Sequence, residues 1–235
     1  MTIALAAPHH AAVEAGRSAI AAGGNALDAA LAAAAMLTVV YPHQCAVGGD
    51  LIALVRRPDG STVAVVAAGT APAAIADVAA AWTEVPRAGA GSVTVPGMFA
   101  GWEAIARLGA VLPLARALED AAAAAEEGTT VSAGLDRALV SRADAILADP
   151  GLRDVFTRDG ALLVEGDALV QPALARSLRR MAADPHDFYA GDIARSLVAT
   201  LRADGGTHTV DDFAGYRPEV TEALTRFADA ALGAA

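Results

Sequence analysis

The stretch AAGGNALDAALAAAAMLTVVYPHQCAVGGD, residues 21–50, decides the fold because it predicts a helix end, a helix start and a buried helix in immediate succession. The glycine pair at 23–24 is typical of a helix C-terminus, since glycine adopts the left-handed backbone conformation at little cost. Asn25, with Asp28 three residues later, predicts a capping box at the start of the next helix. Residues 29–41 are apolar on all sides, so we expect that helix to be buried.

Turn signals after this helix predict a β-hairpin. Pro42 ends the helix, and the glycine loop at 47–49 leads into residues 51–55, which have the pattern of a buried strand. The Pro58-Asp59-Gly60 turn then returns the chain along residues 61–66, as turns of this composition do in hairpins. We expect the paired strands to form one edge of a sheet.

The remaining chain reads mainly as helices. Apolar periodicity predicts helices at 11–22, 112–127 and 132–147. Residues 225–235 are either a final helix or the point before which a segment is missing. Residues 155–164, with Arg158-Asp159-Gly160 at the centre, predict a second hairpin.

The composition excludes several classes of protein. With 235 residues and no linker-like stretch, the chain is expected to form a single domain, 1–235. The formal net charge of −10 argues against binding nucleic acid or an anionic membrane surface, which require clustered Lys and Arg. The single cysteine, Cys45, excludes an internal disulfide and gives no zinc spacing. We therefore expect no metal and no cofactor, and interpret Cys45 as a small core residue.

The sequence also lacks membrane signals. It has no basic and apolar signal segment at its start, and its longest apolar run is shorter than the ~20 residues that a membrane span needs. We therefore expect a soluble protein of the cytoplasm.

Several motifs, taken in order, resemble the large subunit of the gamma-glutamyltransferase family of N-terminal nucleophile hydrolases. The resemblance runs from about Ala4 to Tyr216. The segments that carry it are Gly23-Gly24-Asn25-Ala26-Leu27-Asp28, Val95-Pro96-Gly97-Met98-Phe99-Ala100-Gly101-Trp102, Gln171-Pro172-Ala173-Leu174-Ala175, Phe188-Tyr189-Ala190-Gly191 and Asp212-Phe213-Ala214-Gly215-Tyr216.

The resemblance implies an α+β fold, the four-layer αββα N-terminal nucleophile hydrolase fold, completed by a second chain. In the family, a precursor cuts itself and the freed threonine of the small subunit becomes the nucleophile. No catalytic residue is therefore expected in this chain. The expected partners are the small subunit, as a heterodimer or a dimer of heterodimers, and a small-molecule substrate. The Thr-containing stretch 206–209 is not taken as a cut site, because the fragment after it is too short to build half a sheet.

One departure from the family pattern predicts an altered substrate. The family's Asp-x-Arg-Glu-x-Ala-Pro segment supplies an arginine that holds the α-carboxylate of a γ-glutamyl substrate. This chain reads Val66-Ala67-Ala68-Gly69-Thr70-Ala71-Pro72, so Ala68 replaces that arginine and cannot make its bidentate pair. Arg87, or an arginine of another chain, is the alternative source of a cation.

The expected pocket combines this segment with the glycine loop. In the Val-Pro-Gly motif, Gly97 is expected to permit an approach too close for a side chain. The residues predicted to bind substrate are Ala68, Gly69, Thr70, His43, Gly48, Gly49 and Asp50.

Three functions follow from the resemblance. The first is a hydrolase of altered specificity that cleaves an amide or a carbon–carbon bond in natural-product biosynthesis, as actinobacterial relatives implicated in alkylproline antibiotic assembly do. The second is an ordinary γ-glutamyl transferase or hydrolase acting on glutathione-like substrates. The third is an inactive homologue that acts as a binding protein. No GxSxG, Walker or HExxH motif supports another class.

Overall fold

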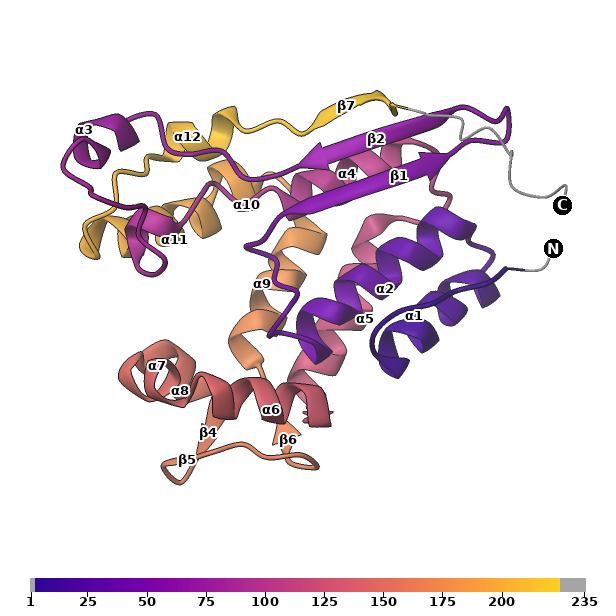
Figure 1. Cartoon of the computed structure of the whole chain (residues 1–235). Coiled ribbons are helices and arrows are strands. Elements are labelled where there is room, and N and C mark those ends of the chain that lie inside the picture. The colour runs from indigo at the N-terminus through magenta and orange to yellow at the C-terminus, as the bar shows by residue number, and fades with distance from the viewer. Residues whose placement is uncertain (1–2, 225–235) are drawn as a thin grey trace, which may run out of the picture.

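The computed structural model of the protein describes residues 3–224 (Figure 1). Its α-helices are α1 His10–Ala21, α2 Ala26–Val40, α3 Ile75–Ala79, α4 Met98–Arg107, α5 Leu114–Glu127, α6 Ala133–Ser141, α7 Ala143–Ala148, α8 Pro150–Phe156, α9 Pro172–Ala183, α10 Asp187–Ala190, α11 Asp192–Ala203 and α12 Val210–Gly215, with a 3-10 helix η1 at Ala90–Ser92. Its strands are β1 Leu51–Arg56, β2 Thr62–Ala67, β3 Thr129–Thr130, β4 Thr157–Arg158, β5 Ala161–Leu162, β6 Ala168–Leu169 and β7 Glu219–Glu222.

The start of α2 confirms the predicted helix boundary. Gly23 has a φ of +90° and follows the end of α1, while the side chain of Asn25 accepts hydrogen bonds from the backbone N–H groups of Leu27 and Asp28. Asp28 completes the box by accepting from the Asn25 N–H at 2.7 Å. Its buried carboxylate also accepts from the N–H groups of Val111 and Leu112, at 3.1 and 2.9 Å. Asp28 thus ties the start of α2 to the loop before α5.

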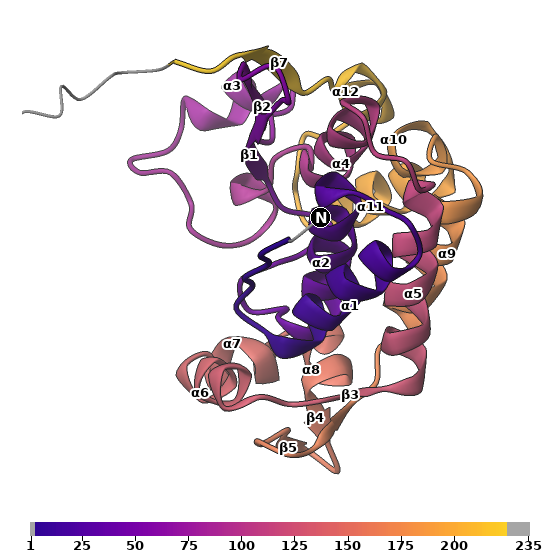
Figure 2. The ribbon, with the colours of Figure 1, turned by 90° about the vertical axis from the view of Figure 1, so that its right-hand side faces the viewer.

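The predicted first hairpin is confirmed. Strands β1 and β2 pair antiparallel from Leu51↔Ala67 to Arg56↔Thr62, and β7 pairs with the other side of β2. Figure 2 shows this sheet nearly edge-on, with α4 against one of its faces. Beyond α4 lie α2 and α5, and α1 and α9 pack outside them. The main core therefore lies between the sheet and these helices.

Residues 51–55 were predicted to form a buried strand. This prediction is wrong for the outer face of the sheet, which lies opposite α4. On β1, the side chains alternate, and Ile52 and Leu54 are 75% and 69% exposed. The inward residues are half-buried or buried because they face α4. The apolar pattern of 51–55 is therefore matched by burial on one face of the strand only.

The second hairpin is shorter than predicted. Only Thr157–Arg158 and Ala161–Leu162 pair as strands, while Val155 and Phe156 lie in α8. The reason is that Asp149 caps α8 at the N–H of Leu152 and Pro150 occupies its first turn, so the helix extends into the expected strand.

Three further predictions are adjusted by the structure. The helix predicted at 132–147 is two helices, α6 and α7, separated at Arg142. Cys45 is half-buried in the loop after α2 rather than in the core. Residues 225–235, for which a final helix was one alternative, lie outside the described residues. Among residues 3–224, no helix combines the length and the apolar character needed to cross a bilayer.

Candidate functional site

The glycine loop, the end of β2 and the entrance to α4 meet at one corner of the sheet. The carbonyl oxygen of Gly49 accepts hydrogen bonds from the N–H groups of Gly97 and Met98, at 3.1 and 2.9 Å. Thr70 forms an isolated β-bridge with Val95, whose N–H donates to the Thr70 carbonyl at 2.8 Å. Backbone hydrogen bonds therefore fix three segments that are distant in sequence.

A carboxylate stands at the centre of this junction. Asp50 precedes β1, and its Oδ1 accepts a hydrogen bond from the N–H of Gly69 at 2.7 Å. The side chain of Asp50 is exposed, as are Ala68 and Thr70 on the neighbouring segment. The charged group beside Ala68 is therefore an anion.

Tyr216 holds the segment 68–70 in place through a hydrogen bond. Its hydroxyl donates to the carbonyl oxygen of Ala68 at 2.9 Å across 148 residues of chain. Burial raises the pKa of Tyr216, and the negative charge of Asp50 raises it further. The phenol is therefore neutral near pH 7 and acts as a hydrogen-bond donor.

Tyr189 plays the corresponding part for the Val-Pro-Gly segment. Its hydroxyl donates to the carbonyl oxygen of Pro96 at 2.9 Å and accepts from the N–H of Ala100 at 3.1 Å. The rings of Tyr189 and Tyr216 stack, with centroids 5.8 Å apart and planes at 14°, and burial raises the pKa of Tyr189 strongly. Sequence reasoning assigned neither tyrosine a role, although both lie in the motifs 188–191 and 212–216 that carried the resemblance.

Two glycines permit the close packing at this corner. A Cβ atom on Gly97 would overlap the carbonyl oxygen of Ala67 and lie 2.5 Å from the Tyr216 hydroxyl. A Cβ on Gly69 would overlap the side chain of Thr94 and lie 2.6 Å from the Val95 oxygen. The predicted close approach at Gly97 is confirmed.

The structure brings together five of the seven residues predicted to bind substrate. Asp50 and Gly69 are bonded to each other, while Gly49, Ala68 and Thr70 are held at the same corner by hydrogen bonds to the α4 entrance, Tyr216 and Val95. They form the candidate site.

The other two predicted residues lie differently. Gly48 borders an adjacent apolar cavity of about 320 Å³ between α9 and α11. His43 instead packs on Tyr41, with ring centroids 4.1 Å apart, and lies near Gly134 of α6. Burial lowers the pKa of His43, and the charge of Arg137 lowers it further. His43 therefore belongs to the packing between α2 and α6.

Known proteins place the chain in a family. Residues 12–230 match the family model described as Gamma-glutamyltranspeptidase, and the chain belongs to this family, as its motifs predicted. It is 37% identical over 216 residues to a glutathione hydrolase-like proenzyme of Bacillus subtilis, with 90% of this chain and 41% of that protein aligned. It is 35% identical over 227 residues to an oxamate amidohydrolase proenzyme of Klebsiella pneumoniae, with 93% and 43% aligned.

A solved structure confirms the predicted fold. The chain superimposes on the gamma-glutamyltranspeptidase of Helicobacter pylori with a TM-score of 0.85 and 26% sequence identity, covering 94% of this chain and 66% of that one. It is thus an α+β chain with the fold of this N-terminal nucleophile hydrolase family. The chain spans about two fifths of the length of the curated relatives given above.

Proposed function

We propose that this chain is the large subunit of a self-processing hydrolase of altered substrate specificity, whose threonine nucleophile lies on a small subunit from the same precursor. Two relatives are proenzymes, and the chain aligns with 41% and 43% of their lengths. The threonine would attack an amide carbonyl and form a covalent acyl-enzyme, which water then hydrolyses. This chain would supply substrate contacts only.

The observation that carries the altered specificity is the position of Ala68 next to Gly69, whose N–H donates to the carboxylate of Asp50. Where the family pattern has an arginine for the α-carboxylate, this chain presents a methyl group beside an exposed carboxylate. A substrate carboxylate at that point would meet like charge instead of a bidentate partner. The site therefore suits an acyl group that is neutral, or carries an ammonium, at this position.

The finer part of the proposal is the cleavage of an amide or carbon–carbon bond in the biosynthesis of an alkylproline antibiotic precursor. It rests on the Ala68 departure and on the resemblance to such relatives. A cytoplasmic location, a single domain and a dimer of heterodimers belong to the same proposal.

We expect the second subunit to pack on the outer face of the sheet. Ile52 and Leu54 project from it, 75% and 69% exposed, and pair in register with Val66 and Ala64 of β2. Contiguous apolar surface of this kind is typical of an interface. We place the small subunit there.

The substrate proposal is tested with Ala68→Arg in the purified, processed protein. The wild type should hydrolyse an acyl anilide that lacks an α-carboxylate better than a γ-glutamyl anilide. Restoring the cation should raise kcat/KM for the γ-glutamyl anilide about tenfold or more, equivalent to ~1.4 kcal/mol. Ala76→Arg, an exposed position on α3, is the control and should leave both substrates unchanged.

The ordinary function is the second candidate, because one relative is a glutathione hydrolase-like proenzyme. Efficient turnover of the γ-glutamyl anilide by the wild type, with no gain in Ala68→Arg, would establish it instead. N-terminal sequencing of the second polypeptide decides the inactive alternative, which predicts that no threonine stands at its start.

The subunit proposal is tested by co-purification. Leu54→Asp should release the second polypeptide from an affinity-tagged large chain, because it places a charge in an apolar contact. Val140→Asp on α6, at a side chain that is 65% exposed, should retain it. Retention in both variants would place the second subunit elsewhere.

A further inference from the structure

A polar cavity lies behind the candidate site. It has a volume of about 340 Å³, opens to solvent, and is bordered by α4, α10 and the segment from α12 into β7. Tyr216 connects the two places, because it lines the cavity while its hydroxyl holds the Ala68 carbonyl. Nothing in the proposed hydrolysis uses this cavity.

One wall carries an acidic and a basic side chain on α4. Glu103 and Arg107 are four residues apart and project to the same side of the helix. Within residues 3–224, Glu103 has no cationic nitrogen within 4.0 Å. Burial raises the pKa of Glu103, and the more distant Arg107 only partly offsets this effect. A half-buried carboxylate without a close cation is stabilised by a ligand that brings one.

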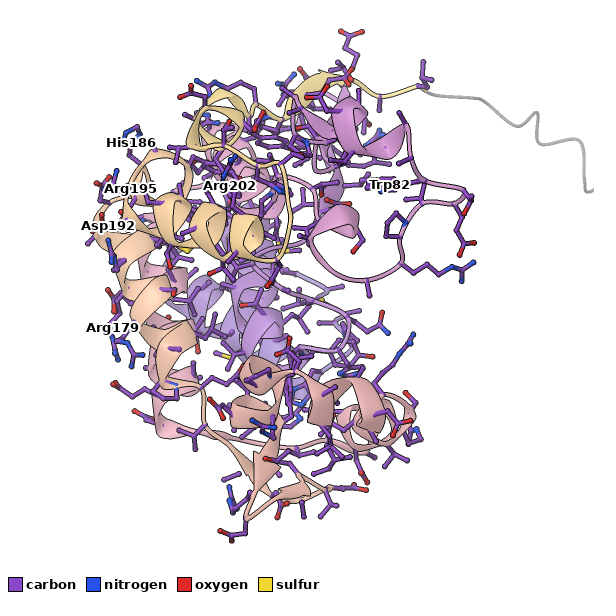
Figure 3. The ribbon with its side chains drawn as sticks, turned by 90° about the vertical axis from the view of Figure 1, so that its left-hand side faces the viewer. Trp82, Arg179, His186, Asp192, Arg195 and Arg202 are labelled. Carbon is purple, nitrogen blue, oxygen red and sulfur yellow. The ribbon has the colours of Figure 1, made fainter. Side chains whose placement is uncertain are left out.

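The facing wall carries a second guanidinium. Nη1 of Arg217 donates to the carbonyl oxygens of Ala214 and Tyr216, at 2.8 and 2.6 Å, which holds the side chain at the rim. A guanidinium has five N–H donors, so Arg217 retains further donors for an anion. His186, at the start of α10, adds an imidazole to the same rim, and Figure 3 shows it at the edge of the molecule.

The rest of the cavity is apolar. The stacked rings of Tyr189 and Tyr216 contribute to its lining, together with alanine and proline side chains. Such a surface favours an aliphatic group over a further charge.

We propose that this cavity binds a free α-amino acid with an aliphatic side chain. Its carboxylate would pair with Arg107 and Arg217, its ammonium with Glu103, and its side chain would lie on the tyrosine rings. The three functional groups of the ligand thus meet three chemically matching parts of one cavity. The site is independent of the proposed hydrolysis, and is separated from it by the side chain of Tyr216.

The test is a binding measurement with L-leucine by ligand-observed NMR on the purified protein. L-Leucine should bind in the millimolar range or tighter. Its analogue without the ammonium, 4-methylpentanoate, and its analogue without the carboxylate, 3-methylbutylamine, should bind about tenfold more weakly or not at all.

Two variants and two matched controls locate the site. Glu103→Gln and Arg107→Gln should each weaken L-leucine about tenfold or more. Glu14→Gln and Arg17→Gln make the same charge changes in an exposed ion pair on α1 and should leave the affinity unchanged. Circular dichroism verifies that all four variants are folded.

Several outcomes would overturn the inference. They are the absence of binding at about 10 mM L-leucine, equal binding of 4-methylpentanoate, or unchanged affinity in both α4 variants. Loss of binding in Ala68→Arg but not in Glu103→Gln would move the ligand to the candidate site, and also contradicts it. Because binding is measured without turnover, failure here leaves the proposed hydrolysis untouched, and an inactive enzyme leaves this site testable.

Discussion

The two faces of the three-stranded sheet are similar in sequence and opposite in environment. On the inner face, Val63, Val65 and Ala67 are buried against helices, whereas on the outer face Ile52 and Leu54 are mostly exposed. Both faces are apolar, so composition does not explain the difference. What differs is the cover that this chain supplies. Helices of this chain pack on the inner face and hold the candidate site in place. In our proposal, a second polypeptide covers the outer face.

The largest expected loss of stability comes from a substitution at Gly97, where the chain packs closely on the inner face of the sheet. Gly97→Ala should destabilise the protein by about 3 kcal/mol or more, because the added methyl overlaps backbone that cannot easily move. Chemical denaturation measures the change in unfolding free energy. Gly48→Ala is the matched control: a Cβ there has no heavy atom within 4 Å, and the change should be within about 0.5 kcal/mol. Equal effects would show that close approach is not what Gly97 provides.

The second prediction compares the faces directly. Val65→Ala removes fully buried methyl groups from the inner face and should cost about 2 kcal/mol in unfolding free energy. In this chain measured without a partner, Leu54→Ala should cost less than about 0.5 kcal/mol. A large cost at Leu54 under those conditions would mean that the outer face is covered within the chain itself.

Alkaline pH should lower the unfolding free energy through the two tyrosines at the candidate site. Burial raises the pKa values of Tyr189 and Tyr216, so the folded protein retains protons that the unfolded chain releases above about pH 10. The unfolding free energy should therefore be unaffected below this pH and should fall above it, by at most ~1.4 kcal/mol per pH unit for each tyrosine. Denaturation at several pH values measures the slope, which should be shallower in Tyr189→Phe. An identical slope would exclude that tyrosine as a source.

The smallest expected effect is the loss of one hydroxyl. Tyr216→Phe removes the hydrogen bond to the Ala68 carbonyl and should cost about 1 kcal/mol. The same variant should raise KM for the hydrolysed substrate if the segment 68–70 contacts it. A change in stability without any change in KM would limit Tyr216 to a structural part.

The sequence alone predicted the features that depend on neighbours along the chain. The Asn25–Asp28 box and the turn at Gly60 depend on residues a few positions apart, and local signals of this kind are strong. The hydrogen bond from Tyr216 to the Ala68 carbonyl joins positions 148 residues apart, so no local sequence pattern predicts it. The position of His43 beside Gly134 of α6 was likewise not predictable from a local pattern, because the two residues are distant in sequence.

Burial was the harder property to predict from sequence. An apolar strand pattern at 51–55 indicates surface that avoids water, but it does not say which polypeptide covers each face. The length of the second hairpin was overestimated for a different reason. The cap at Asp149 and the proline after it extend α8 into residues that the strand pattern had assigned to the hairpin.

The strand order β1-β2-β7 has a consequence for how the protein is made. Within the described residues β1 has a partner on one side only, so its other edge offers unpaired N–H and C=O groups next to an apolar face. Exposed edges of this kind recruit further strands and promote aggregation. A newly synthesised chain that exposes this edge and face is therefore prone to aggregation. Production of residues 1–235 alone should yield more aggregated protein than co-production with the second polypeptide of our proposal.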